Sequence, residues 1–236
     1  MPFSGTLHKG EDFTKKRFSG ETFAGILFRA CTFSKAVFED CFFREASFEA
    51  CDLGRVRFAS CSFEEASFFK CDLSRAAFEF LFAPSLLIRE CALHQSRWIH
   101  SLLPGLILES GEMDRADLAF CTLEGLRMEN CNGFRLSLES CDLDRAMLIG
   151  CALRKAVISG CFVNHSHIEH TDLRGARFLD LEASGLEWDP VLLDGSKFAH
   201  CVFTGSRVRA GDVNPEARGL VLTDDAGLPG LGTPRG

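Results

Sequence analysis

The sequence predicts an all-β fold, a solenoid of short strands stacked along one axis. Three regularities favour this fold class. A large apolar residue recurs at almost every fifth position from Phe3 to Val213, a small residue stands two positions before it, and the other three positions are mostly polar. Because neither the helical period of 3.6 nor the strand period of 2 gives a repeat of five, each unit must turn a corner. Stacked coils of such units satisfy their backbone by pairing with the coils above and below.

The column of large residues keeps one register over nearly the whole chain. Phenylalanine dominates its first part and leucine a later part, and only Ala83, Gly133 and Ala183 interrupt it. Two side chains of each unit therefore point inward and three point outward. The composition agrees, because 23 Phe, 2 Trp and no Tyr are expected where rings are buried without a hydrogen-bond partner.

All twelve cysteines occupy the small position, two residues before the large one. No Cys-x-x-Cys pair occurs, and a tetrahedral zinc site needs four ligands that converge on one point. We therefore interpret the thiols as small buried apolar groups, with metal binding or disulfides as the alternatives. Twelve free thiols also predict a reducing compartment, and hence a cytoplasmic protein. They are Cys31, Cys41, Cys51, Cys61, Cys71, Cys91, Cys121, Cys131, Cys141, Cys151, Cys161 and Cys201.

Length and composition exclude several classes of protein. The chain has 236 residues, of which 46% are hydrophobic and 25% charged, so it can bury a large core and is not disordered. No apolar run approaches the ~18 residues of a transmembrane helix, and residues 1–12 lack the pattern of a signal peptide. The formal net charge of -7 disfavours binding to nucleic acid or to an anionic membrane surface.

Five segments resemble the consensus of the pentapeptide repeat family. The resemblance implies a right-handed quadrilateral β-helix with four pentapeptides, and thus twenty residues, in each coil. We name its faces A, B, C and D, centred on Phe3, His8, Phe13 and Phe18 and repeating every twenty residues. All cysteines then lie on faces A and C, which are opposite. The five segments are Cys51-Asp52-Leu53, Cys71-Asp72-Leu73, Ala116-Asp117-Leu118, Cys141-Asp142-Leu143 and Thr171-Asp172-Leu173.

The repeat assigns residues 1–213 to the β-helix. After it, Asn214, Pro215 and Glu216 supply an N-cap, a proline at the first helical position and an acid in the first turn. We expect a short helical cap over 214–222, covering the unpaired edge of the last coil. Residues 223–236, which are rich in Gly and Pro, are expected to form a flexible tail.

An irregular stretch surrounds Pro84 and Pro104, which stack on face A in consecutive coils. Each proline lacks a backbone donor, so we expect the edge to be distorted there. The outward positions nearby turn apolar, which predicts a contact surface for a partner or a second copy. The alternative is a local change of register that tucks some of these side chains inward. They are Phe80, Phe82, Leu87, Ile99, Leu102 and Ile107.

Catalytic chemistry has little support in the sequence. A convex rod filled by Phe and Leu has no evident cleft, and no G-x-S-x-G, phosphate-binding loop or dinucleotide motif occurs. His165, His167 and His170 cluster near the corner between faces A and B, and His-x-His can hold a metal ion. No third ligand is evident, so we interpret the cluster as a solvated corner. We expect no enzyme activity, no metal site and no cofactor.

Face C carries two columns of charge. Seven basic residues share one outward position, and four acids lie three residues before it. We interpret these columns as ladders of opposite sign that pair with each other. The basic column is Lys15, Lys35, Arg55, Arg75, Arg115, Arg135 and Lys155, and the acids are Asp12, Asp52, Asp72 and Asp172.

Face A carries most of the net negative charge. Seven outward acids stand against only two bases, Arg44 and Arg145. We take these acids as candidate partner-binding residues, with an ordinary solvated face as the alternative. They are Glu45, Glu64, Glu65, Glu124, Asp142, Asp144 and Glu182.

The function that we predict comes from the family resemblance. The chain resembles the quinolone-resistance (Qnr) and mycobacterial resistance members in length, uninterrupted rod, acidity and the segment Cys91-Ala92-Leu93-His94-Gln95-Ser96-Arg97-Trp98, although it lacks obvious projecting loops. This implies a non-enzymatic mimic of duplex DNA that binds DNA gyrase or topoisomerase IV and protects it from topoisomerase poisons. The alternative is an interaction scaffold in an unrelated regulatory pathway. A homodimer is a further possibility. Neither a nucleic acid nor a membrane is an expected partner.

Overall fold

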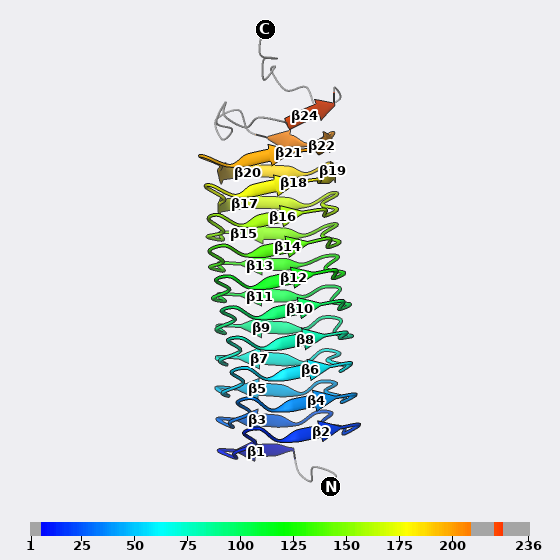
Figure 1. Cartoon of the computed structure of the whole chain (residues 1–236), viewed down its shortest axis with the longest axis vertical. Coiled ribbons are helices and arrows are strands. Elements are labelled where there is room, and N and C mark those ends of the chain that lie inside the picture. The colour runs from blue at the N-terminus through cyan, green and yellow to red at the C-terminus, as the bar shows by residue number, and fades with distance from the viewer. Residues whose placement is uncertain (1–5, 209–219, 224–236) are drawn as a thin grey trace.

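The predicted all-β solenoid is confirmed. The computed structural model describes residues 6–208 and 220–223, which form short parallel strands stacked along one axis. Figure 1 shows the strands as successive rungs, from β1 near the N-terminal end to β24 near the other. Each strand pairs with the strand one coil away, so Phe28 faces Phe48 and Trp98 faces Leu118 in the ladders.

Face B is an eleven-stranded parallel sheet. Its strands are β1 (Leu7–Lys9), β3 (Leu27–Arg29), β5 (Ser47–Glu49), β7 (Ser67–Phe69), β9 (Leu87–Arg89), β11 (Ile107–Glu109), β13 (Arg127–Glu129), β15 (Met147–Ile149), β17 (His167–Asp172), β20 (Glu187–Leu192) and β23 (Arg207–Val208).

Face D is a ten-stranded parallel sheet, and a three-stranded sheet completes face A at the C-terminal end. The strands of face D are β2 (Arg17–Ser19), β4 (Val37–Glu39), β6 (Arg57–Ala59), β8 (Ala77–Glu79), β10 (Arg97–Ile99), β12 (Asp117–Ala119), β14 (Ser137–Glu139), β16 (Val157–Ser159), β18 (Arg177–Leu179) and β21 (Lys197–Ala199). The third sheet contains β19 (Glu182–Ser184), β22 (Cys201–Thr204) and β24 (Leu220–Thr223).

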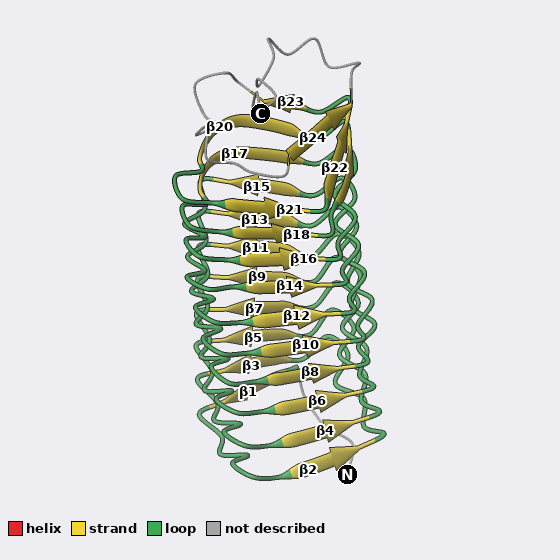
Figure 2. Ribbon diagram, turned by 45° about the horizontal axis from the view of Figure 1, so that its top comes forward, coloured by secondary structure: helices red, strands yellow, loops and turns green. Residues whose placement is uncertain are grey.

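Over most of the rod, neighbouring coils pair through a single bridging residue on faces A and C, such as Phe82 with Leu102, and through three-residue strands on faces B and D. The cause of the single bridge is a tight turn that follows the centre of each of faces A and C. On face A, the backbone N–H of Ala46 donates to the carbonyl of Phe43 at 3.0 Å, and the turn between them leaves room for only one bridging residue. The two long sheets therefore form opposite walls, joined by turns (Figure 2).

A left-handed backbone conformation marks all but one of the described corners between residues 10 and 205. Between residues 10 and 205, each residue whose number is a multiple of five has φ between +48° and +68°, except Pro190. Only 11 of these corner residues are glycine, and none of the 28 others is β-branched. Proline fixes φ near -65° and is excluded from this conformation. Strand β20, which contains Pro190, continues through this corner.

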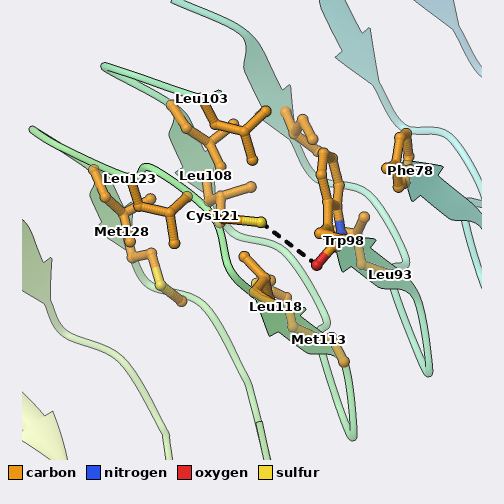
Figure 3. Close-up of a cluster of buried hydrophobic side chains, with 14 of the residues drawn as sticks. Phe78, Leu93, Trp98, Leu103, Leu108, Met113, Leu118, Cys121, Leu123 and Met128 are labelled. Atoms are coloured by element: carbon orange, nitrogen blue, oxygen red, sulfur yellow. Dashed lines mark hydrogen bonds between the residues drawn. The ribbon is translucent and has the colours of Figure 1, made fainter. Parts of the chain in front are cut away.

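The interior is a continuous stack of apolar side chains. On face A the ring of Phe43 lies parallel to those of Phe23 and Phe63, with centroid distances of 4.7 and 4.6 Å. Further along the rod, Trp98 stacks on Phe78 and the core changes to leucine and methionine (Figure 3). The indole N–H of Trp98 donates to the Ser96 hydroxyl at 3.2 Å, so this large ring keeps a polar partner inside the core.

All twelve cysteines are buried and free, as predicted. On faces A and C the cysteine position lies just after a strand end, where the thiol donates to inward-pointing carbonyl groups. Cys51 donates to the carbonyl groups of Glu49 and Phe28, both at 3.4 Å, and Ser101 makes the equivalent bond where the column lacks a thiol. Burial raises the pKa of the Cys31 and Cys201 thiols, which keeps them protonated and unreactive.

The C-terminal region differs from the sequence-based expectation. Residues 220–222, predicted to end a helical cap, belong to strand β24, which pairs in parallel with β22. The segment Leu220–Thr223 is rich in strand-favouring residues, and the edge of β22 offers unpaired backbone groups, so strand addition prevails. The rest of the predicted cap and most of the predicted tail, residues 214–219 and 224–236, lie outside the described residues. Nowhere in the described part of the chain is there a helix long and apolar enough to cross a membrane.

The corner conformation yields a test on Ala50, an exposed corner residue with φ of +50°. Ala50→Gly should raise the free energy of unfolding by roughly 0.5–1 kcal/mol, because glycine adopts this conformation without a steric penalty. Ala50→Val should lower it by about 1–2 kcal/mol. Urea titration followed by circular dichroism measures both. Ala77→Val, in strand β8, is the control and should be neutral or stabilising; equal effects of valine at both positions would contradict the account.

Candidate functional site

Face A presents three outward side chains in each coil, one from the bridging residue and two from the turn. In the coil that contains Pro84 these are Phe82, Pro84 and Ser85, and in the next coil they are Leu102, Pro104 and Gly105. None of these six residues is charged. The middle of face A is therefore an uncharged zone two coils wide, while the coils on either side carry acids.

Apolar side chains cover this zone and extend around its corners. Phe80, Phe82 and Leu102 are 60%, 45% and 51% exposed. Leu87, Ile99 and Ile107 are half-buried, on the adjoining strands of faces B and D. None of the six predicted patch residues is tucked into the core, so the alternative of a local change of register is wrong. We call these six residues, together with Phe120, the apolar band.

Phe120 is the member of the band that the sequence analysis missed. It is 52% exposed and belongs to a stack of three rings at the corner between faces D and A. His100 lies between Phe80 and Phe120, with centroid distances of 5.3 and 5.0 Å and nearly parallel planes. The signal was the spacing of twenty residues, which places these three rings in one column. The stack holds the exposed rings in fixed positions before any partner arrives.

Pro84 and Pro104 do not distort the edge, contrary to the expectation. Each occupies the first turn position, whose backbone N–H takes no part in the coil-to-coil ladder. At the equivalent positions elsewhere this N–H meets a side chain instead, as that of Ser74 meets Asp72 Oδ1 at 2.8 Å. The ladder continues past both prolines, since Glu65 N donates to the Pro84 carbonyl at 3.1 Å. A proline ring also suits the second residue of a β-turn.

The seven predicted acids of face A fall into two groups. Two of them are neutralised locally: Glu45 pairs with Arg44 at 3.2 Å, and Glu124 pairs with Arg145. The other five form no ion pair within residues 6–208. They are Glu64 and Glu65 on one side of the apolar band, and Asp142, Asp144 and Glu182 on the other.

Hydrogen bonds fix two of the unpaired acids in place. Asp142 Oδ1 accepts the backbone N–H of Asp144 at 3.0 Å, and Asp144 Oδ1 accepts the backbone and side-chain N–H groups of Asn164 at 3.0 and 2.9 Å. Each carboxylate keeps a second oxygen for another partner. The structure thus brings the predicted acids to one face and separates them by the apolar band.

A family model described as pentapeptide repeats matches residues 46–79 and 112–148 in eight copies. The chain belongs to the pentapeptide repeat family. Among solved structures, HetL of the cyanobacterium Nostoc sp. strain PCC 7120, a pentapeptide repeat protein involved in heterocyst differentiation regulation, is 18% identical, with 88% of this chain and 89% of HetL covered and a TM-score of 0.58.

Two further solved structures are similar at lower TM-scores. Trypsin-treated QnrB1, a plasmid-mediated fluoroquinolone resistance protein, is 19% identical, with 92% of this chain and 91% of QnrB1 covered and a TM-score of 0.32. The periplasmic alginate epimerase AlgG is 9% identical, with 92% and 75% covered and a TM-score of 0.39. No curated protein sequence matches this pentapeptide repeat protein.

Two members of the histidine cluster of this pentapeptide repeat protein, His167 and His170, lie next to acids on strands β17 and β20. His167 lies 3.4 Å from Glu169 and 3.6 Å from Glu187, and His170 lies 3.3 Å from Glu169. His165 occupies the corner before β17. Within the described residues no group of three or more His, Cys, Asp or Glu side chains has the arrangement of a metal site.

The exposure of the apolar band can be tested on this pentapeptide repeat protein without a partner. The double variant Phe82→Ser/Leu102→Ser should lose most of the fluorescence of a bound hydrophobic dye. Its melting temperature should change by no more than about 2 °C, because surface substitutions shift stability by roughly 0.5 kcal/mol. Leu192→Ser/Val202→Ser, at exposed positions away from the band, should leave dye binding unchanged. A large loss of stability in the first variant would show that its side chains belong to the core.

Proposed function

We propose that this pentapeptide repeat protein is a non-enzymatic interaction module that binds a protein partner through face A. The observation that carries the proposal is the apolar band between two groups of unpaired acids. Exposed apolar surface that is rimmed by charge is typical of a protein–protein contact. The apolar centre would supply the binding energy, and the flanking acids would select and orient the partner.

The charge pattern favours a partner of a different sequence over a second copy. If a second rod docked antiparallel on the band, a two-fold axis between the Pro84 and Pro104 coils would place Glu64 and Glu65 of one copy opposite Glu124 of the other. Like charges in such an arrangement repel each other. A partner with an apolar patch flanked by Lys and Arg side chains complements face A without this penalty.

DNA gyrase or topoisomerase IV is our first candidate partner. Enzymes that hold duplex DNA present basic surfaces, and the family resemblance points to members that occupy such a surface. The acids alone are too sparse to copy DNA. Five unpaired acids over six coil spacings of ~4.8 Å give about one charge per 6 Å, against one per ~1.7 Å in the duplex. Mimicry would therefore depend on the width of the rod and on the two local acid groups.

A regulatory scaffold unrelated to gyrase is the second candidate. The apolar band favours it, because duplex DNA offers no equivalent surface and a DNA mimic does not need one. The fold does not decide between the two functions. In either case we place the protein in the cytoplasm, since its free thiols suit a reducing compartment.

Protection of gyrase tests the first candidate. The variant Glu64→Gln/Glu65→Gln/Asp142→Asn/Asp144→Asn removes four charges and keeps the hydrogen-bond acceptor oxygens. We expect that at least ten times more of this variant than of wild-type protein is needed to rescue DNA supercoiling in the presence of a quinolone. The loss follows from weaker attraction to the basic surface of the enzyme.

The matched control neutralises four acids on the opposite face, Asp12→Asn/Glu112→Gln/Asp114→Asn/Asp194→Asn. Both variants change the formal net charge from -7 to -3, since -7 + 4 = -3. The control should protect gyrase as wild-type protein does. Equal loss in both variants would show an effect of overall charge alone. If wild-type protein neither binds gyrase or topoisomerase IV nor protects them, the first candidate is wrong.

Affinity capture from a lysate tests the second candidate. Phe80→Ser/Phe82→Ser/Phe120→Ser should lose a specific partner that the wild-type protein and the four-acid variant of face A both retain. These rings lie outside the core, so the variant should fold normally by circular dichroism. A partner that is captured equally well by the band variant would exclude the band as its docking surface.

A further inference from the structure

The basic column of face C is a second ordered feature of the surface, on the side opposite face A. Its seven residues stand at left-handed corners, with φ between +57° and +60°. All seven are exposed. Because the coils stack at ~4.8 Å and the column runs over seven coil spacings, it is about 34 Å long. Only the coil with Gln95 interrupts it.

None of the seven cations makes an ion pair within residues 6–208. Several arginines on the two sheet faces behave differently, because they reach a glutamate of the neighbouring coil. On face B, Arg29 lies 2.7 Å from Glu49, and on face D, Arg57 lies 2.8 Å from Glu79. In the column of face C, Arg75 has only the neutral Gln95 as its partner, at 3.2 Å.

The acidic column beside it does not pair with these cations, so the interpretation of two mutually paired ladders is wrong. The carboxylates turn to the backbone instead. Asp52 Oδ1 accepts the N–H of Gly54 at 2.9 Å, and Asp72 Oδ1 accepts that of Ser74 at 2.8 Å. Hydrogen bonds from the Thr14 side chain and from the Thr14 backbone N–H lower the pKa of Asp12. Aspartate thus stabilises the turns and leaves the corner cations available.

Hydrogen-bond donors line a shallow groove along the column. Between the second and fifth coils the groove is lined by Lys35, Arg55 and Arg75, by the hydroxyl groups of Ser34 and Ser74, and by His94, Gln95, Gly54, Asp52 and Asp72. Further along, Phe134 is half-buried between two cations of the column. Arg135 lies 5.2 Å and Lys155 5.7 Å from its ring centroid.

We propose that the basic column of face C binds a linear phosphate polyanion. Phosphate oxygens accept hydrogen bonds from Lys, Arg and Ser side chains at once, which is the donor set that the groove offers. A flexible chain can adjust its repeat to a column of cations that stand one coil apart, which a rigid duplex cannot do. The ligand class is therefore a single-stranded nucleic acid or an inorganic polyphosphate, which share this backbone chemistry.

The protein as a whole is negatively charged, and this net charge repels polyanions at long range, so the column must attract them locally. At an ionic strength of 0.15 M, charges more than ~8 Å apart are largely screened, so the acids on the other faces weaken binding at the column only a little. Faces A and C are opposite walls of the rod. A polyanion on face C would leave face A open, and one rod could hold a phosphate polymer and a protein partner together.

Fluorescence anisotropy of a labelled oligothymidylate of about ten to fifteen nucleotides tests the proposal, since a strand of this length is long enough to span the column. Unlabelled inorganic polyphosphate is the competitor in a second arm. The variant Arg55→Gln/Arg75→Gln/Arg115→Gln/Arg135→Gln removes four cations of the column. The control Arg29→Gln/Arg57→Gln/Arg89→Gln/Arg97→Gln removes four ion-paired arginines from faces B and D. Both change the formal net charge from -7 to -11, since -7 - 4 = -11.

Wild-type protein should bind at roughly 50 mM salt and lose affinity as salt rises. The column variant should bind at least tenfold more weakly, with a salt slope smaller by about 3, while the control should change by less than threefold. Binding of both polymers, or of one alone, supports the proposal and shows which polymer the column accepts. Failure to bind either polymer, equal losses in both variants, or equally tight competition by polyglutamate would overturn it.

Discussion

The left-handed corner at every fifth residue is the constraint on which the rest of the molecule depends. A chain of L-residues takes this conformation at a steric cost, and 28 non-glycine residues of the described part of the chain take it. The cost is offset by the core, because each corner brings two more side chains inward and aligns the backbone with the next coil. With the corners fixed, the inward or outward direction of each side chain follows from its position in the five-residue unit.

The corners also place the outward side chains in regular columns and rows on the surface of the rod, which together form a grid. Residues twenty apart lie in one column at the strand spacing, so a chemical property that repeats with this period becomes a stripe along the rod. The four faces use the grid differently. On faces B and D, glutamates and arginines of neighbouring coils pair, as Arg89 does with Glu109. Face A has its apolar band between unpaired acids, and face C has unpaired cations. The functional proposals follow from this difference between paired and unpaired columns.

The five-residue period was enough to predict the fold, the buried column and the position of every thiol, because that period fits few structures other than a stacked coil. Contacts within one turn could not be read from it. The fit of Pro84 depends on which N–H groups the ladder leaves unused, and the role of Asp52 depends on a bond to the Gly54 backbone. Predicting the stack of rings on His100 would have required comparing residues twenty apart at the corners as well as on the faces. Strand β24 was not predicted, because its conformation depends on pairing with the edge of β22, which the local sequence does not show.

The central claim is that the interior is sealed and that only the exterior of the rod acts. Titration of the sulfhydryl groups with a bulky aromatic disulfide in native buffer tests it most directly, because all twelve thiols are buried in the core. The account predicts almost no reaction before denaturant is added, and then reaction of all twelve. Rapid reaction of most of the thiols in native buffer would contradict it, since the walls of the rod would then be open.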